Sequence, residues 1–580
     1  MALSAGLNMA ISGMMTTALK TSLSSQNITN ADKAGYSRKE LDVQYLTTSA
    51  GSTPVSGVVI GTTDKFMLKA LVGDISTYQA KEVVSTSLDY YVTQVGNTDG
   101  NNSLSSSLDK LYSSLQYVAT NPETAANKSE VVQTADTIAN SLRDLTNDIQ
   151  KLRLSNEQKI ADSVTNINAI VARIHDLNEK VAGSVRGDAN TAEYEDQRNL
   201  ELQNLAGEID IQYFYTNDNR LQIYTGTGQA LLLSEPQQVT YAVTNQVTPT
   251  TTYPADFSPI TLNGTDITTS VRSGKLAGYI DLRDNIYVKE QAKLDEFSTV
   301  LKTQVNTLLN NGASVPSRNL MEGSLKALTA GTAFSATGTI RVAVTDRAGT
   351  IVNYSDINLG AMTSVNDVMT ALNGIPGVTA SLNTDGQLSI LASPSTNGIS
   401  INPMSSSVTS STGQSFSSYF GLNDLFTGTA GASDIKVSSY LLTAPEYLSI
   451  GTLSTSATLA VGDRGVNRGD GSIAQSLADM LNNNVSFNAA GDFASQNNTL
   501  QRYAQAFISS AASKADLSQK DSDTSLSVFK TSSDLLTSNN GVNVDEETAK
   551  LLVYQNQYQA GAQVVKTIQE MLDALIAAIR

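Results

Sequence analysis

The chain has 580 residues, with 38 Lys and Arg against 55 Asp and Glu, so its formal net charge is −17. It contains no basic run of the kind that follows a phosphate backbone, so nucleic acids and anionic membrane surfaces are poor partners. The absence of cysteine excludes disulfides and thiolate metal sites. A hydrophobic content of 40% over this length is enough for several domains with conventional cores.

The N-terminal segment predicts a helix with an apolar seam. Residues 1–31 carry one charge, Lys20. Apolar residues recur there at alternating steps of four and three, as in a heptad repeat: Leu3, Leu7, Ala10 and Met14, with Ile11 beside them. Because Lys20 follows these positions and Asn8 and Ser12 interrupt them, no cleavable signal peptide is expected.

Helical periodicity dominates the next part of the chain, after a turn-rich stretch at 49–61. Apolar stripes of helical spacing cover 104–118, 131–152 and 160–181. The third stripe continues after a register break near Asn156. Gly183 and Gly187 are expected to end the helical block, which is interpreted as a rod-like bundle.

Two β-rich regions alternate with further helices. A period of two begins near Ile209 and predicts strands, with the polar stretch 248–252 as a loop. Helical spacing returns at 294–308, strands are expected again from 340 with a short helix at 365–372, and the serine-rich 405–418 is interpreted as an exposed loop. Helices resume from 472 and through 500–511.

The C-terminal segment predicts a second and stronger seam. Asp545, Glu546 and Glu547 are interpreted as an N-cap and first-turn negative charge for one helix of roughly 50 Å. Its seam residues again step by four and three: Tyr554, Tyr558, Gly561, Val565, Ile568, Leu572, Leu575 and Ile579. The apolar stretch 574–579 is too short to span a bilayer, so no membrane insertion is expected.

These elements predict a multidomain α+β protein. Its parts are a terminal α-helical coiled coil, an elongated α-helical bundle and inserted β-rich outer domains. The coiled coil joins residues 1–37 to 545–580. The helical rod is expected to comprise 38–208, 270–315 and 460–544, with a β-rich insertion at 209–269 and β-rich outer domains at 316–459.

Both ends of the chain resemble one family, the rod, hook and hook-associated proteins of the bacterial flagellum. The N-terminal motif residues are Asn27, Asn30, Gly35, Tyr36 and Arg38; the C-terminal ones are Asn543, Asp545 and Glu546. The long helices, followed by Asp196, Gln197 and Arg198, resemble the hook-filament junction members. Asn199 departs from the acidic residue common there, and 338–426 has no resemblance that could be placed.

The resemblance implies a structural subunit that joins hook to filament and is required for filament assembly. The implied partners are further copies in a helical or ring assembly, the hook protein, the second junction protein and an export chaperone at the C-terminus. It also implies a secreted, extracellular protein that leaves the cell by type III export. The expected assembly interface is Leu3, Leu7, Ile11, Met14, Tyr554, Tyr558, Val565, Ile568, Leu572, Leu575 and Ile579.

No catalytic, cofactor-binding or metal site is expected, and the protein is not predicted to be an enzyme. His175, the only histidine, lies in a helical stripe, and Arg468-Gly469-Asp470 is interpreted as a chance match to an adhesion tripeptide. Two alternatives stay open: another axial protein (hook or distal rod), which the position in the flagellum would reveal, and a surface adhesin or ligand-binding protein, which a pocket with converging polar groups would favour.

Overall fold

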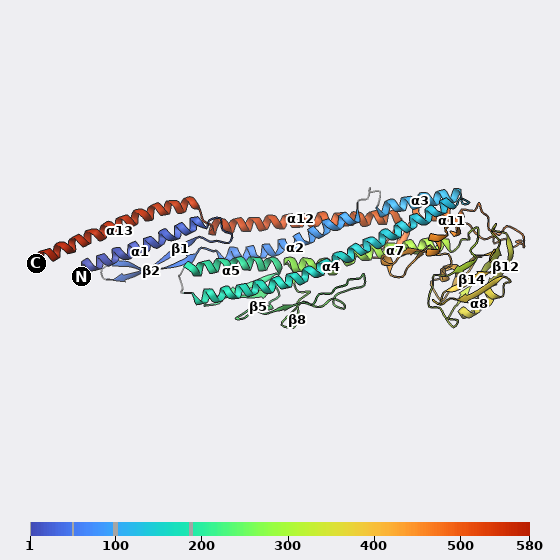
Figure 1. Ribbon diagram of the computed structural model, residues 1–580, viewed down its shortest axis with the longest axis horizontal. Coiled ribbons are helices and arrows are strands. Elements are labelled where there is room, and N and C mark those ends of the chain that lie inside the picture. The colour runs from blue at the N-terminus through green and yellow to red at the C-terminus, as the bar shows by residue number, and fades with distance from the viewer. Residues whose placement is uncertain (1, 49–50, 97–102, 185–188, 580) are drawn as a thin grey trace.

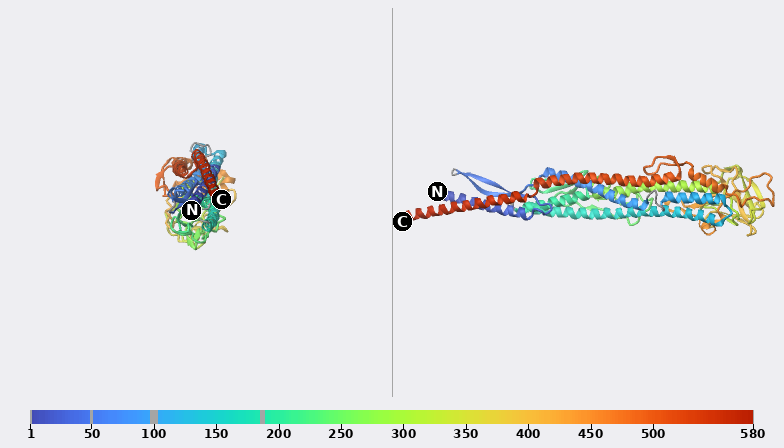
Figure 2. Two further views of the ribbon diagram at one scale, coloured as in Figure 1. Left: turned by 90° about the vertical axis from the view of Figure 1, so that its left-hand side faces the viewer. Right: turned by 90° about the horizontal axis from the view of Figure 1, so that it is seen from above.

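The computed structural model describes residues 2–48, 51–96, 103–184 and 189–579. It shows a long, thin molecule, with both termini at one end and a group of short strands at the other (Figures 1 and 2). Helices that are far apart in the sequence run side by side between the two ends.

The end with the termini contains two helices and a hairpin. Helices α1 (Ala2–Thr29) and α13 (Val544–Ile579) lie side by side, and strands β1 (Lys39–Thr48) and β2 (Gly51–Gly61) pair antiparallel beside α1. The prediction of a turn-rich stretch at 49–61 is therefore wrong for 51–61. Glycine and serine in this stretch favour turns, whereas the β-branched Val58, Val59 and Ile60 favour a strand.

The rod consists of long helices packed lengthwise. Helix α4 alone has 59 residues, about 90 Å at about 1.5 Å per residue. The helices of the rod are α2 (Lys65–Val95), α3 (Leu104–Thr120), α4 (Ala125–Gly183), α5 (Ala189–Glu208), α6 (Gly274–Asp281), a π-turn (Leu282–Ile286), α7 (Tyr287–Leu309), α11 (Ser472–Asn482) and α12 (Leu500–Asn540).

Helix α4 is continuous through the register break near Asn156, where buried polar residues take the place of the apolar stripe. Glu157 accepts a hydrogen bond of 2.5 Å from the Arg283 guanidinium, and both side chains are fully buried. The Arg153 guanidinium donates to the carbonyls of Thr251 (2.7 Å) and Arg283 (3.0 Å). These bonds fasten the loop before β7 and the π-turn to the middle of α4.

Short strands cover one side of the rod near its α5 end. Two antiparallel sheets pack there in a core shared with α2, α4 and α5. Their strands are β3 (Ile211–Tyr215), β4 (Leu221–Thr225), β5 (Ala230–Leu232), β6 (Val239–Thr240), β7 (Thr261–Leu262) and β8 (Thr265–Asp266).

The far end is a β unit with its own core. Two three-stranded sheets, ordered β12-β11-β15 and β13-β14-β9, enclose it together with α8 and α9. The elements from this unit to α12 are β9 (Leu320–Glu322), β10 (Ala336–Thr337), β11 (Thr339–Thr345), β12 (Ile351–Asn358), α8 (Val365–Asn373), β13 (Val378–Leu382), β14 (Leu388–Ala392), β15 (Gly398–Asn402), β16 (Ser407–Val408), α9 (Phe416–Phe420), β17 (Phe426–Thr427), β18 (Lys436–Val437), α10 (Ser439–Thr443), β19 (Val485–Phe487) and β20 (Gln496–Asn498).

The predicted fold class is confirmed: terminal helices, an elongated helical bundle and inserted β-rich regions make a multidomain α+β chain. Within the region assigned to outer β domains, Leu425, Phe426, Leu448 and Ile450 pack in the core of the helical rod. The domain boundaries themselves stay a prediction.

We expect Phe416→Ala to destabilise the distal β unit by about 3–5 kcal/mol, because a fully buried ring leaves a cavity. The Phe416 ring centroid lies 5.0 Å from that of Phe420 and 6.3 Å from that of Phe334. Hydrogen exchange should accelerate in β11 and β15 and stay unchanged in α4. Phe66→Ala, at a side chain that is 83% exposed, is the control and should alter neither region.

Candidate assembly site at the terminal helices and their joint to the rod

Helices α1 and α13 pair antiparallel along their length. A Cβ built on Gly6 would lie 3.7 Å from Ile568 Cδ1, and one on Gly561 would lie 2.7 Å from Met14 Cγ. Nearer the rod, the Lys20 ammonium lies 5.8 Å from the centre of the Tyr554 ring. Residue numbers therefore rise along α1 as they fall along α13, and the two helices contact each other side by side.

The expected interface residues lie on or beside the contact between the two helices. Half-buried members are Leu3, Leu7, Met14, Tyr554, Val565, Ile568 and Leu572. More exposed are Ile11 (39%), Tyr558 (44%) and Leu575 (56%). The side chain of Ile579, at the last residue of α13, lies outside the described part of the structure. None of the described members is fully buried, because two helices cover only one side of each other.

A second, more exposed apolar stripe lies beside the seam on each helix. On α1 it contains Met15 (65% exposed) and Leu19 (52%). On α13 it contains Val553, Val564 and Met571, each about half exposed. These residues are separated by eleven and seven positions, close to whole helical turns, a signal that the search for one seam missed. An unpartnered apolar stripe of this kind marks a surface for further association.

Asn27 holds the base of this helix pair together. Its amide oxygen accepts hydrogen bonds from Tyr36 Oη (3.0 Å) and the Lys39 backbone N–H (2.9 Å). Its amide nitrogen donates to the Lys39 carbonyl (3.0 Å) and to Glu547 Oε2 (3.2 Å). One buried side chain thus connects the end of α1, the chain leading to β1 and the first turn of α13.

The chain after α1 is tied to α5 by a buried ion pair. The Lys39 ammonium contacts the Asp196 carboxylate and donates to the Ala192 carbonyl at 3.0 Å. Asp196 also accepts from the Ser37 backbone N–H (2.8 Å) and hydroxyl (2.6 Å). Desolvation raises the pKa of Asp196, although Lys39 and Ser37 act in the opposite direction. Removing either charge would leave the other buried and unpaired.

The remaining N-terminal motif residues shape the turn between α1 and β1. Gly35 has φ +75°, and a Cβ there would approach Leu200 of α5 to 3.3 Å, so both conformation and space favour glycine. Asn30 Nδ2 donates to the carbonyl of Gln26 in a solvent-exposed hydrogen bond of 2.9 Å. Neither Asn27 nor Asn30 adopts the left-handed conformation that sequence reasoning considered for a helix end.

The three adjacent motif residues on α5 point to different partners. Asp196 faces the N-terminal chain, whereas Arg198, which is buried, donates to Asn178 Oδ1 on α4 (3.1 Å) and to the Asn219 carbonyl (2.7 Å). Gln197 is exposed and bonds to Glu193. The motif thus fixes α5 to the terminal joint on one side and to α4 and the β3–β4 turn on the other.

The C-terminal motif residues begin α13 and contact the same joint. The N-cap is Asn543, whose Oδ1 accepts from the backbone N–H groups of Asp545 (3.0 Å) and Glu546 (3.2 Å); the prediction of Asp545 as the cap is wrong. Asn543 can reach these groups because α13 starts one residue later, at Val544. Glu546 also lies 3.4 Å from the Arg38 guanidinium.

Glu547 accepts hydrogen bonds within the joint, whereas the sequence alone predicted only that it adds negative charge to the first turn of α13. Burial alone would raise its pKa, but hydrogen bonds from Ser24, Asn27 and Lys550 outweigh burial and lower it. Its carboxylate therefore stays ionised while it accepts from α1.

Among the described residues, no group of three or more His, Asp and Glu side chains gathers in a way that could hold a metal ion. In the same part of the chain, every helix is too short or too polar to cross a membrane.

Comparisons with known proteins match this arrangement. Residues 92–321 match the family model of the flagellar hook-associated protein FlgK helical domain, and residues 537–578 match that of the flagellar basal body rod FlgEFG protein C-terminal region. Flagellar hook-associated protein 1 of Escherichia coli is 22% identical over 98% of this chain and 99% of its own length. Its Salmonella typhimurium counterpart is 23% identical over the same shares.

A solved structure of the flagellar hook junction protein FlgK from Burkholderia pseudomallei has a TM-score of 0.49 and 16% identity, covering 81% of this chain and 99% of that one. The two family-model matches together show that the chain resembles proteins of the flagellar axial class. Within that class it resembles flagellar hook-associated protein 1 (FlgK) along nearly its whole length, which confirms the resemblance inferred from the motifs.

We expect Asn27→Ala to release the terminal helices from the rod, at a cost of about 2–4 kcal/mol, because buried groups of Lys39 and Glu547 lose their partner. Hydrogen exchange should accelerate at 36–39 and in the first turn of α13. Asn30→Ala is the matched control: it removes one exposed bond and should cost less than about 0.5 kcal/mol. Equal protection in both variants would contradict the role of Asn27.

Acidification should loosen the base of α13. The pKa of Glu547 is lower in the folded chain than its ordinary 4.5, so its contribution is complete above that value and is lost as pH falls through the folded pKa. Far-UV ellipticity should show a loss of helix in this acidic range. In Glu547→Gln, which cannot titrate, that part of the transition should disappear; a titration identical to that of the unmodified chain would contradict the assignment.

Proposed function

We propose that this chain is a structural subunit of the bacterial flagellum that joins the hook to the filament and is required for filament assembly. The observation that carries the proposal is the pair of chain-end helices that cover each other on one side and leave apolar stripes exposed on the other. Similarity to relatives named flagellar hook-associated protein 1, over 98% of the chain, supports the same function.

The helix pair suits the inner wall of a tube. If each exposed stripe packs on a different surface of the next copy, the contacts are heterologous, and such contacts build rings or helical tubes. In this arrangement the expected interface residues and the second stripes, including Val564 and Met571, pack on neighbouring copies. The rod would form the next shell, and the distal β unit, at the opposite end of the molecule, would face outward (Figure 1).

The helical domain favours a junction protein over the alternative hook or distal rod protein. The match at 537–578 is to a model of axial rod proteins, whereas the match at 92–321 is specific to the FlgK helical domain. The partners that follow from the proposal are further copies, the hook protein and the second junction protein. An export chaperone bound at α13 would cover the exposed stripes before assembly, and export would not require a cleavable signal.

We expect Val564→Asp combined with Leu575→Asp to abolish assembly without destabilising the single chain. Both side chains are at least half exposed in the monomer, at 50% and 56%, so little changes until a neighbouring copy buries the new carboxylates. Cells carrying the variant should secrete filament subunits unpolymerised, while thermal unfolding of the purified monomer stays unchanged. Asp573→Asn, an exposed change on the same helix, is the control and should leave motility intact.

Immunogold labelling of detached flagella tests the position. Label confined to the hook-filament boundary is expected. Label along the hook, along the rod or on the cell body would contradict the proposed function.

A further inference from the structure

The chain passes between the rod and the distal β unit through a neck, defined as residues 306–318, 422–426 and 446–453. The first segment continues the end of α7 outward, the second returns to the rod, and the third leads outward again. Leu425, Phe426 and Leu448 pack in the core of the rod, whereas Ala313 and Leu453 pack with β11 and β12 in a small separate core. Domains of one chain usually move relative to each other unless their interface is extensive. The bonds of the neck therefore decide whether the distal unit moves.

Asn306, in the last turn of α7, binds the returning segment as a neighbouring strand would. Its amide oxygen accepts hydrogen bonds from the backbone N–H groups of Leu425 (3.1 Å) and Phe426 (3.0 Å). Its amide nitrogen donates to the Phe426 carbonyl at 2.7 Å. The Asn306 side chain is buried, so water does not compete for these groups.

Asn310 and Arg318 bind the residues just before these. Asn310 Oδ1 accepts from the Asn423 backbone N–H (2.8 Å), and Asn310 Nδ2 donates to Asp424 Oδ1 (2.6 Å). Arg318 Nη1 donates to the Leu422 carbonyl at 3.2 Å. Asn310, Arg318 and Asn423 are all buried. Side chains of the outgoing segment thus hold main-chain groups of the returning segment from 422 to 426.

The third segment is tied to the outgoing segment and to the rod. Ala313 and Gly451 exchange two backbone hydrogen bonds, of 2.7 and 3.1 Å, in an antiparallel bridge. The Lys128 ammonium of α4 donates to the carbonyls of Val315 (3.4 Å) and Glu446 (3.1 Å), and the residue is buried. One lysine of the rod therefore contacts both outgoing segments of the neck.

Rotation of the distal unit about the neck would break several of these bonds together. Each bond is directional, and a buried donor or acceptor that loses its partner finds no water to replace it. Apolar packing alone would tolerate sliding. The amide groups of Asn306 and Asn310, by contrast, fit one register of 422–426 on the end of α7.

We propose that the rod and the distal β unit move as one rigid body, and that Asn306 and Asn310 are the positioning residues that fix the angle between them. The inference stands whether or not the chain joins the hook to the filament. In an assembly of the proposed kind, it means that every copy presents its distal unit at the same angle.

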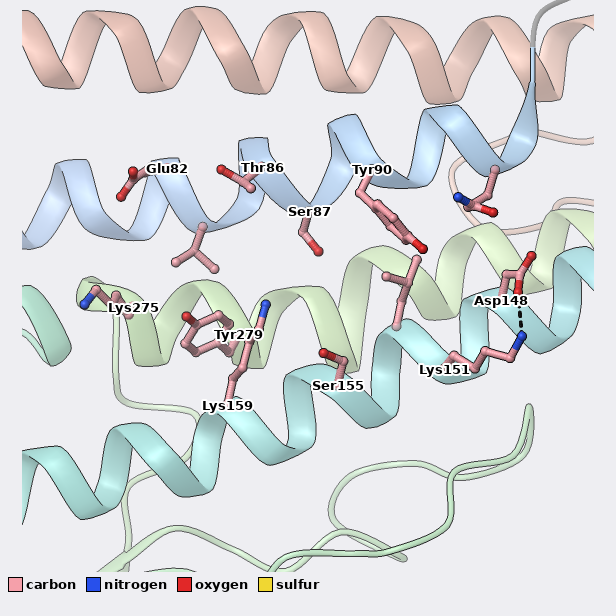
Figure 3. A pocket seen from close by; sticks show the side chains of 13 residues that line it. Glu82, Thr86, Ser87, Tyr90, Asp148, Lys151, Ser155, Lys159, Lys275 and Tyr279 are labelled. Atoms are coloured by element: carbon pink, nitrogen blue, oxygen red, sulfur yellow. Dashed lines mark hydrogen bonds and ion pairs between the residues drawn. The ribbon is translucent and has the colours of Figure 1, made fainter.

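The distance between two spin labels measures this rigidity. The chain contains no cysteine, so two introduced cysteines are the only labelled sites. Thr86→Cys places one label on α2, at a groove between α2, α4 and α6 (Figure 3), and Thr370→Cys places the other on α8; both threonines are exposed. Double electron–electron resonance should give one narrow distance distribution. Adding Asn306→Ala and Asn310→Ala should widen it by about twofold, because the distal unit then samples several angles.

Asn319→Ala is the matched control, because the Asn319 amide nitrogen donates to the carbonyls of Ala392 (2.8 Å) and Asn397 (2.9 Å) inside the distal unit. It should leave the width unchanged. Thermal unfolding of each labelled variant shows whether it is folded. If the double variant is not folded, Asn423→Ala, which removes the bond to the Gly312 carbonyl (3.0 Å), takes its place and should widen the distribution to a smaller extent.

Three results would overturn the inference. A broad or two-peaked distribution in the labelled chain without further changes would show that the distal unit moves independently of the rod. A folded neck variant with an equally narrow distribution would show that the two asparagines do not fix the angle. Widening in Asn319→Ala would attribute the effect to loosening within the distal unit. None of these results bears on the position of the chain in the flagellum, which the immunogold label tests separately.

Discussion

The structure depends on one constraint: in a single molecule, the apolar seams of the two chain ends cover each other, and the β1–β2 hairpin lies beside α1. An antiparallel pair of helices buries one side of each and leaves the rest in water. Leu572 and Val565 are accordingly half-buried, while Met571 and Val564, on a neighbouring face of the same helix, are exposed. The two helices cover one side of each other but leave apolar side chains in water. Burial of these side chains against further copies is the physical basis for assembly.

The polar joint transmits the position of this pair to the rod. Its members, Asn27, Lys39, Asp196 and Glu547, come from α1, β1, α5 and α13, and all are buried. Hydrogen bonds and ion pairs have directions, so they fix the angle and register between elements, whereas apolar contacts tolerate sliding. A subunit whose terminal helices must lie at a defined place in a tube needs such a connection.

The same logic recurs along α4. In its middle, the apolar stripe gives way to Arg153 and Glu157, which hold the loop before β7 and the π-turn by directional bonds. The rod thereby holds α2, α4 and α6 at a fixed spacing. Continuous long helices and these buried hydrogen bonds together give a stiff body between the terminal helices and the distal β unit.

The sequence by itself determined the helical seams, the alternation of helical and β-rich regions and the motif residues. Heptad spacing and a period of two depend only on local geometry, so Tyr554 to Leu572 and Ile340 to Val344 could be assigned without coordinates. Strand β2 was missed because glycine and serine mask β-branched residues in a two-stranded hairpin. The register break near Asn156 corresponds to a turn of α4 whose buried residues are polar.

Only the tertiary structure decided which polar residues meet. Asn27 and Glu547 are 520 positions apart, and Lys39 and Asp196 are 157 apart, so no local pattern relates them. It also decided that Glu547, and not Asp545, serves the joint. The spacing of residues along the chain indicates only which face of its own helix a side chain occupies. Its partner from a distant segment depends on how the helices pack against one another.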